Sequence, residues 1–328
     1  MNESVQNKRS IYDPGPDSRF VATDRGGRSE LSETLGSLSC SRIIAKSNDM
    51  KSENVTDIDV YLDEYSRQDI IARYISRSAG AGIAYVLSHV YSPIYRRAIK
   101  DLLSRPHRDH NFRILEYGCG GGMNLLKLIE ILESEDAQLE TAVGTDFSPP
   151  MIDAAREEAA RHLPPELNQK INYIVAGNEK LMADLSRGLN QSSEQLKNAF
   201  DCVVGVNTFR YAHRLRSENQ CARDIFDLLR PGGYSVMIDM NRYFPFFRSK
   251  LRHMFSPRTN ETYIPSLKEY TRPFKEAGFK IRESRNFCWI PHSAKPGLLA
   301  LCRKLTPLLD VCCSSHAMRS LVIAQKPI

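Results

Sequence analysis

The sequence has no long apolar run, no paired-cysteine motif and no strong excess of charge of one sign. No apolar run approaches the roughly 20 residues that a membrane-spanning helix requires. The eight cysteines include no CxxC pair and no neighbouring His/Cys ladder, so neither a zinc site nor a disulfide framework is expected. The net charge of +6 over 328 residues is too small to indicate nucleic acid as a partner, although it does not exclude one.

The beginning of the sequence also lacks the apolar stretch that follows the charges of a secretory signal, so we expect a cytoplasmic protein. The apolar fraction of 41% is ordinary for a globular chain, and 328 residues are enough for one large core. Residues 1–55 mix Gly, Pro, Ser, Asp and Arg without periodicity, which predicts a disordered tail. Residues 56–110 show helical spacing of apolar and aromatic side chains, which predicts a helical N-terminal cap of two or three helices.

From residue 111 onward, short apolar runs alternate with helical patterns. Such alternation predicts parallel strands joined by right-handed crossovers, that is, a doubly wound α/β fold with a mostly parallel seven-stranded sheet. This domain is expected to span residues 111–328, with cap insertions near 241–264 and 291–316. The predicted strands are 113–117, 141–146, 171–176, 202–206, 234–240, 279–287 and 319–325. The predicted helices are 123–135, 151–163, 221–229, 266–278 and 297–313.

A glycine-rich turn, within ILEYGCGGGMN at 114–124, follows the first predicted strand. Ligands of open parallel sheets bind beyond the carboxyl ends of the strands. Gly118, Gly120 and Gly122 leave room for a ligand to approach the backbone, and they permit the positive φ angles of a sharp turn. The dinucleotide pattern GxGxxG would require glycine where the chain has Met123. A turn of this kind, taken alone, is equally compatible with a structural role.

Two carboxylates accompany the turn. Glu116 precedes Gly118 by two residues; it can accept hydrogen bonds from an amino group, directly or through water, whereas it would repel a pyrophosphate. Asp146 closes the second predicted strand and can accept hydrogen bonds from both ribose hydroxyls, and Phe147 offers an apolar face to adenine. The pattern favours S-adenosylmethionine (SAM) over NAD. By itself, Asp146 is equally consistent with a helix cap or a solvated strand end.

Between Arg113 and Gly278 the chain resembles the class I SAM-dependent methyltransferases, in particular the type 11 group with the ubiquinone and menaquinone biosynthesis enzymes. The resemblance is carried by ILEYGCGGG (114–122), VGTDFS (143–148) and LLRPGG (228–233). It implies SAM as cofactor, a Rossmann-like fold, and cofactor contacts from the glycine turn, including Cys119. It also implies that the exit of the third strand contacts the adenine amine, with Asn178 at the position where the family usually has Asp.

Methyl transfer from a sulfonium is an in-line displacement, and a base is needed only when the acceptor holds a proton. The exit of the fourth predicted strand, residues 206–213, is expected to face the methyl group and to contribute Asn207 to the cofactor site. His213 is the candidate base by residue type, and Tyr211 the candidate for orienting the acceptor. A histidine at a helix start and a packing tyrosine are the alternatives.

The sequence NTFR at 207–210 is not NPPY, which disfavours methylation of amides and exocyclic amines, and no metal-binding carboxylate arrangement is recognisable. We therefore predict metal-independent transfer. Three segments outside the predicted core can roof an apolar acceptor pocket: the tyrosine-rich helical segment before the sheet, the basic aromatic stretch 241–258, and the leucine-rich segment 297–313. Each can equally be a surface helix that packs its apolar side on the core.

The leading hypothesis for the acceptor is a small, hydrophobic metabolite methylated on oxygen or carbon. The stretch 242–258 is a further candidate, for a peripheral membrane contact or for an anionic group of the substrate. Two alternatives stay open: an RNA or protein acceptor that docks on 242–258, and a SAM-binding partner subunit without activity. The sequence makes no prediction of the oligomeric state.

Overall fold

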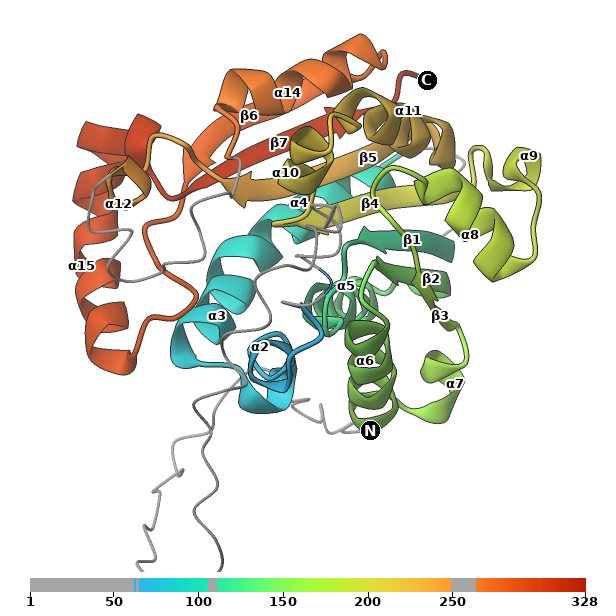
Figure 1. Ribbon diagram of the computed structural model, residues 1–328, viewed down its shortest axis with the longest axis horizontal. Helices are drawn as coiled ribbons and strands as arrows, with labels where there is room; N and C mark the ends of the chain where they lie inside the picture. The colour runs from blue at the N-terminus through green and yellow to red at the C-terminus, as the bar shows by residue number, and fades with distance from the viewer. Residues whose placement is uncertain (1–61, 63–64, 106–110, 249–263) are drawn as a thin grey trace, which may run out of the picture. The chain divides into compact units, whose positions relative to one another are not determined.

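The computed structural model describes residues 62, 65–105, 111–248 and 264–328 (Figure 1). All of them belong to one compact unit, Tyr61–Ile328. The predicted tail at 1–55 lies outside the described residues, and so does most of the predicted insertion at 241–264. In the part of the chain that is described, no helix is both long and apolar enough to cross a membrane.

Seven strands form one sheet in the order β3-β2-β1-β4-β5-β7-β6 (Figure 1). The first five strands of this order pair in parallel, and β7 is antiparallel to both of its neighbours. The strand order therefore reverses beside β1, which is where doubly wound sheets bind ligands. The strands are β1 (Asn111–Tyr117), β2 (Gln138–Asp146), β3 (Ile171–Val175), β4 (Phe200–Val206), β5 (Leu229–Met240), β6 (Lys280–Phe287) and β7 (Arg319–Gln325). The predicted mostly parallel, seven-stranded sheet is confirmed.

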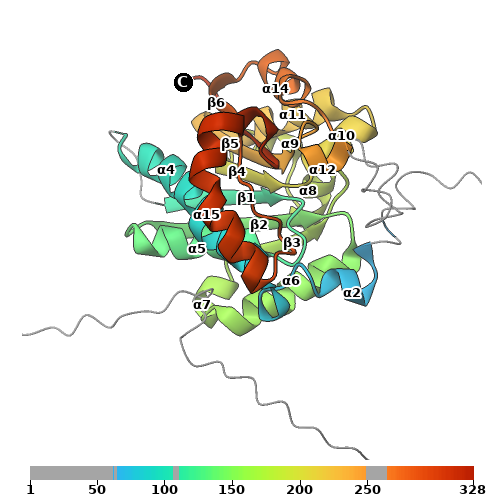
Figure 2. The same ribbon diagram turned by 90° about the vertical axis from the view of Figure 1, so that its left-hand side faces the viewer.

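Helices cover both faces of this sheet (Figures 1 and 2). One face carries α4 (Ser92–Leu103), α5 (Met123–Ser134) and α6 (Pro149–His162), and the other carries α8 (Leu181–Leu189), α11 (Glu218–Leu228) and α14 (Leu267–Glu276). The further helical elements are α2 (Gln68–Ile71), η1 (Ser76–Ser78), α3 (Ala81–Tyr85), η2 (Val86–Tyr91), α7 (Pro165–Asn168), α9 (Ser193–Leu196), α10 (Phe209–Arg214), α12 (Pro245–Arg248), α15 (Pro296–Cys313) and η4 (Ser314–His316).

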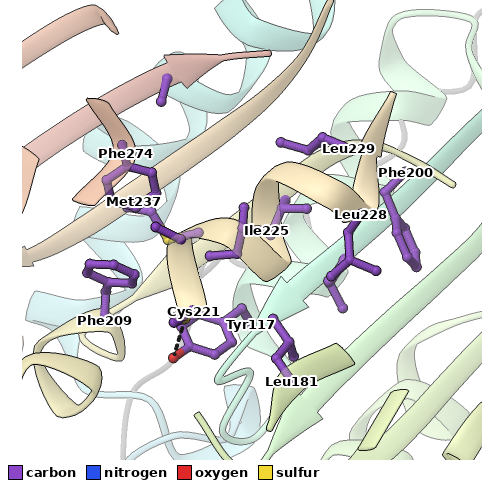
Figure 3. Packing of buried hydrophobic residues seen from close by; sticks show 14 of the residues in the cluster. Tyr117, Leu181, Phe200, Phe209, Cys221, Ile225, Leu228, Leu229, Met237 and Phe274 are labelled. Atoms are coloured by element: carbon purple, nitrogen blue, oxygen red, sulfur yellow. Dashed lines mark hydrogen bonds between the residues drawn. The ribbon is translucent and has the colours of Figure 1, made fainter. Parts of the chain in front are cut away.

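The larger core cluster fills the layer between the sheet and helices α8, α10, α11 and α14 (Figure 3). Ile225 of α11 and Phe274 of α14 meet Met237 of β5 there, and each such side chain stabilises the fold by about 1.5–3 kcal/mol through burial. The Cys221 thiol donates a hydrogen bond to the Tyr117 hydroxyl over 3.1 Å. This layer fixes α10, which follows directly on the exit of β4.

The N-terminal segment becomes one continuous helix over residues 81–103, built from α3, η2 and α4. Its middle part, η2, is a π-helical stretch of six residues. Such stretches are rare and often lie at functional sites. A second, smaller core cluster precedes it, in which Ile70, Ile71 and Ile75 pack against Met151 and Ala154 of α6.

Some element boundaries differ from those predicted. The helices α7, α8, α9, α10 and α12 were not predicted, and β5 begins at Leu229 instead of residue 234. Leu229 pairs with Phe200 of β4, and a register shift then separates that pair from the one between Cys202 and Tyr234. The RPGG segment therefore belongs to the strand and does not precede it.

Candidate functional site

A cavity lies at the carboxyl ends of β1, β2 and β4, the edge at which open parallel sheets bind ligands. The glycine turn and the strand exits form one side of it, and the N-terminal helical segment and the loop before α15 form the other. It is lined by Tyr65, Tyr74, Ile83, Leu87, Tyr91, Gly118, Cys119, Gly120, Met123, Asn124, Asp146, Phe147, Met151, Val206, Asn207, Thr208, Tyr211 and His292.

The glycine turn presents backbone to this cavity. Gly118 has a φ of +67°, and a Cβ at this position would lie 2.2 Å from Thr208 Oγ1, so only glycine fits. Gly122 has a φ of +80° and is the N-cap of α5. Between them, Cys119 donates its backbone N–H to Thr145 O over 2.6 Å. Burial raises the pKa of the Cys119 thiol well above its usual value, so the side chain stays neutral.

Glu116 is fully buried behind the turn and does not line the cavity. Its carboxylate accepts hydrogen bonds from Asn124 Nδ2 at 3.0 Å and from Leu125 N at 2.8 Å, which fastens β1 to the first turn of α5. Burial raises its pKa to about 8. Tyr95 donates to the other side of the Asn124 amide over 3.0 Å. Asn124 lines the cavity and was not predicted as a site residue. Its hydrogen bond to Glu116 holds its side chain in place in the cavity wall.

Asp146 does line the cavity, at the end of β2. One carboxylate oxygen accepts from Gly120 N at 2.9 Å and the other from Ser148 N at 3.0 Å. A carboxylate has about four acceptor positions, and the backbone N–H of Phe147 also contributes a hydrogen bond, so acceptor capacity remains for a ligand hydroxyl. Burial raises the pKa of Asp146 to about 6. The N-cap of α6 is Ser148, which accepts from Met151 N, so Asp146 is not the helix cap.

Aromatic side chains from three segments meet beside Asp146. The hydroxyls of Tyr65 and Tyr211 are 2.6 Å apart, and the Tyr65 ring stands edge-on to Phe147 with centroids separated by 5.5 Å. Arg210 Nη2 donates to the Tyr211 hydroxyl over 2.9 Å. Phe147 and Tyr211 thus lie where the sequence analysis expected them, whereas Tyr65 and Tyr74 were not predicted as site residues.

The exit of β4 is held from two sides. Asn207 has a φ of +57°, and its side-chain oxygen accepts from Arg319 Nη1 of β7 over 2.6 Å. Asn178, at the exit of β3, is buried and donates from Nδ2 to Thr208 O at 3.5 Å. Asn207 lines the cavity and Asn178 does not. Asn178 therefore supports the β4 exit from behind.

The predicted base, His213, lies outside the cavity. Its ring stands edge-on to Phe209 with centroids 5.4 Å apart, and its Nδ1 is 3.7 Å from Glu218. Burial lowers its pKa to about 4. The geometry therefore places His213 in the last turn of α10, packed against Phe209 and away from the cavity, and not at the helix start named above as the alternative.

A different histidine, His292, lines the cavity. Its Nε2 is 3.1 Å from the Tyr91 hydroxyl, and burial together with the Arg319 charge lowers its pKa well below the usual value. The sequence analysis missed it, because no local motif surrounds it.

The residues that line the cavity fit SAM: a side-chain-free turn, a carboxylate with free acceptor positions, and apolar faces from Phe147 and Met151. A sheet of this order with these features defines the class I SAM-dependent methyltransferases. A family model described as "Methyltransferase domain" matches residues 87–284, and the chain belongs to that family. Family membership and the cavity together make the protein a SAM-dependent methyltransferase.

Solved structures share the fold at low sequence identity. The CurJ carbon methyltransferase is 14% identical with a TM-score of 0.50, and the match covers 83% of this chain and 62% of that one. A SAM-dependent methyltransferase from Mesorhizobium loti is 18% identical with a TM-score of 0.47, over 73% of this chain and 100% of that one. No curated protein matches the sequence significantly.

Proposed function

We propose that the protein methylates a small, hydrophobic metabolite on oxygen or carbon, without a metal ion. The observation that carries this proposal is the cavity wall that faces the glycine turn. Helix α3 and the π-helical stretch η2 contribute Ile83, Leu87 and Tyr91 to that wall. Mostly apolar walls with a few polar groups are typical of sites for small molecules.

SAM supplies an electrophilic methyl group on a sulfonium, which an acceptor atom meets in line. In the proposed site the glycine turn and Asp146 hold the cofactor. Phe147, Asn207 and Cys119, which line the cavity, are proposed to contact the cofactor. Glu116 and Asn178 do not line it and are proposed to act indirectly, Glu116 by holding Asn124 and Asn178 by holding the exit of β4. Tyr65 and Tyr74 cover the cavity and exclude water, and the hydroxyl of Tyr211 orients the acceptor.

The pair of Tyr91 and His292 is proposed to take the proton of a hydroxyl acceptor. His292 Nε2 lies 3.1 Å from the Tyr91 hydroxyl, so this nitrogen can accept the proton, although the lowered pKa of the ring weakens it as a base. Burial raises the pKa of Tyr91 well above its usual value, so its hydroxyl stays protonated and can pass a proton to His292 Nε2 while it receives one from the acceptor. Tyr91 thereby acts as a relay.

The basic stretch 242–258, proposed above as a docking site for RNA or protein, or for a membrane, is described only in part. Arg242 pairs with Glu269 at 3.1 Å and donates to Ile264 O over 3.0 Å. Its guanidinium thus has partners within the protein, while 249–258 lie outside the described residues. The apolar cavity wall favours the small-molecule acceptor.

Labelled methyl transfer tests the acceptor class. The full chain is incubated with methyl-labelled SAM and a cell extract, which is then separated into lipid, small-molecule, RNA and protein fractions. We expect label in the lipid or small-molecule fraction, and no label with the Asp146→Ala variant. Label found only in RNA or only in protein contradicts the proposal. A chain that binds SAM but labels none of the fractions favours the partner subunit without activity.

A further inference from the structure

Helix α15 (Pro296–Cys313) presents an apolar face to the outside of the molecule. It has 18 residues, none of which is buried. Leu298, Leu301, Leu305 and Leu308 keep 47%, 53%, 42% and 62% of their surfaces exposed. Isolated exposed leucines are ordinary, but a contiguous row of them marks an interaction surface. Figure 2 shows α15 lying along the side of the molecule that faces the viewer.

The four leucines form one stripe, because their spacing of three and four residues follows the helical repeat. We call them the outer stripe. A neighbouring stripe of half-buried residues, one position further along the chain in each case, faces the body of the protein: Leu299, Cys302, Thr306 and Leu309. The contacts of α15 with the body are thus made by a different set of side chains, and the outer stripe is left without a partner among the described residues.

Positive charges accompany the outer stripe. Lys295 precedes the helix, and Arg303 and Lys304 lie within it. The Arg303 guanidinium stacks over the Tyr85 ring at 4.8 Å, and no carboxylate among the described residues pairs with Lys295 or Lys304. The one acid of the helix, Asp310, accepts a hydrogen bond from Trp289 Nε1 at 2.8 Å. Lys295 and Lys304 therefore flank the outer stripe, whereas Arg303, two residues from both Leu301 and Leu305, lies on the other side of the helix against Tyr85.

The same side of the molecule carries exposed aromatic rings and lies next to the cavity. Tyr243 and Phe246 are 43% and 39% exposed. The ring of Phe244, between them in the sequence, lies 6.4 Å from that of Trp289. Trp289 is the residue that donates a hydrogen bond to Asp310 of α15. The loop before α15 brings His292 to the cavity.

We propose that the outer stripe of α15 binds the surface of an anionic lipid bilayer. An apolar face flanked by Lys and Arg is the pattern by which helices lie in the interface of such membranes, and tryptophan and tyrosine favour the same depth. A second copy of the chain fits less well. A helix of 18 residues is about 27 Å long, so a stripe about 10 Å wide covers roughly 270 Å². Stable interfaces need about 800 Å² from each partner.

Vesicle flotation with the full chain tests this surface. The vesicles are phosphatidylcholine alone, and phosphatidylcholine with phosphatidylglycerol at a ratio of about 3:1, because anionic lipid supplies the charge complement. The test variant is Leu301→Ser/Leu305→Ser/Leu308→Ser. Its control is Ile328→Ser, since Ile328 is an apolar residue with 97% of its surface exposed that lies outside α15. Folding of both variants is checked by the thermal shift that SAM causes.

We expect the wild type and Ile328→Ser to float with the anionic vesicles, at least fivefold less with neutral ones, and less at about 0.5 M NaCl because salt screens the attraction. The triple variant should lose at least fivefold in the bound fraction. Trp289 is the only tryptophan of the chain, so its emission should shift to shorter wavelength when anionic vesicles are added.

Three results would overturn the proposal: no flotation of the wild type, undiminished flotation of the folded triple variant, or a wild-type dimer in sedimentation velocity that the triple variant abolishes. The last result would make the outer stripe a self-association surface. Vesicle binding is measured without turnover, so it stands or fails independently of the acceptor proposed above.

Discussion

At Gly118, backbone conformation and a neighbouring side chain each require glycine. Gly118→Ala is expected to strain a φ of +67° and to press a Cβ against Thr208 Oγ1, which destabilises the protein by about 2–3 kcal/mol. Adding Thr208→Ala should recover only the part that comes from Oγ1, because Cβ of residue 208 stays 2.6 Å from the new Cβ. Denaturant unfolding measures both variants. Gly80→Ala is the control, because nothing lies within 4 Å of a Cβ there. Equal losses in the single and double variants would contradict the contact with Thr208.

Asp146 should make SAM binding depend on pH. Its pKa of about 6 means that the carboxylate is ionised at pH 7.5 and mostly protonated at pH 5, where it loses part of its capacity to accept hydrogen bonds. We expect SAM affinity to fall about tenfold between these pH values. Asp146→Asn should bind weakly at both. Calorimetric titration measures this, with Asp153→Asn on the exposed side of α6 as control. Identical pH profiles for wild type and Asp146→Asn would remove the ribose assignment.

The two histidines allow a matched comparison once an acceptor has been found. His292→Gln should lower kcat by about 10²-fold or more at an unchanged SAM affinity, as expected for the loss of a general base. His213→Gln should leave kcat within about twofold, because His213 lies away from the cavity. Steady-state kinetics with a hydroxyl acceptor decide between them. A loss confined to His213→Gln would restore that residue as the base.

At the scale of elements, most strands were predictable because they are short buried runs with polar residues at their ends. The exception is the edge strand β6, in which only Phe287 is buried. The helices α8 and α9 were missed since residues 181–196 are mostly polar and bury little besides Leu181, Leu185 and Leu196. The glycine turn and Asp146 follow local patterns and were found. His292 was not, because its position depends on a distant contact, in which Gly82 N donates to Ala294 O over 3.0 Å.

Helix α2 and its flanking turns cover the cavity with Tyr65 and Tyr74. The smaller core cluster packs this segment against α6. Ile71, 6% exposed, packs there against α6. Ile71→Ser is therefore expected to release Tyr65 and Tyr74 from the cavity and to weaken SAM binding about tenfold, while the main core, which does not include it, keeps its circular dichroism. Gln68→Ser, an exposed position of the same helix, is the control. Unchanged affinity of Ile71→Ser would mean that the cover contributes nothing to cofactor binding.

For the whole molecule, cofactor binding should appear as global stabilisation. A ligand at about 100 times its Kd stabilises the folded state by about 2.7 kcal/mol, which for a domain of this size raises Tm by about 5 °C. We expect SAM to cause this shift and NAD at the same concentration to cause none. Differential scanning fluorimetry measures both. A shift with NAD alone would revive the dinucleotide site that Met123 disfavours.

The place of β7 in the sheet has a consequence for how the nascent chain acquires activity. β7 is translated after the six other strands, yet it lies between β5 and β6. Until the ribosome has released it, β5 has an open edge and β6 has no partner to pair with. Arg319, which holds Asn207 at the cavity, belongs to the same strand. The cofactor site is therefore complete only once β7, which follows the other strands of the sheet along the chain, has inserted between β5 and β6.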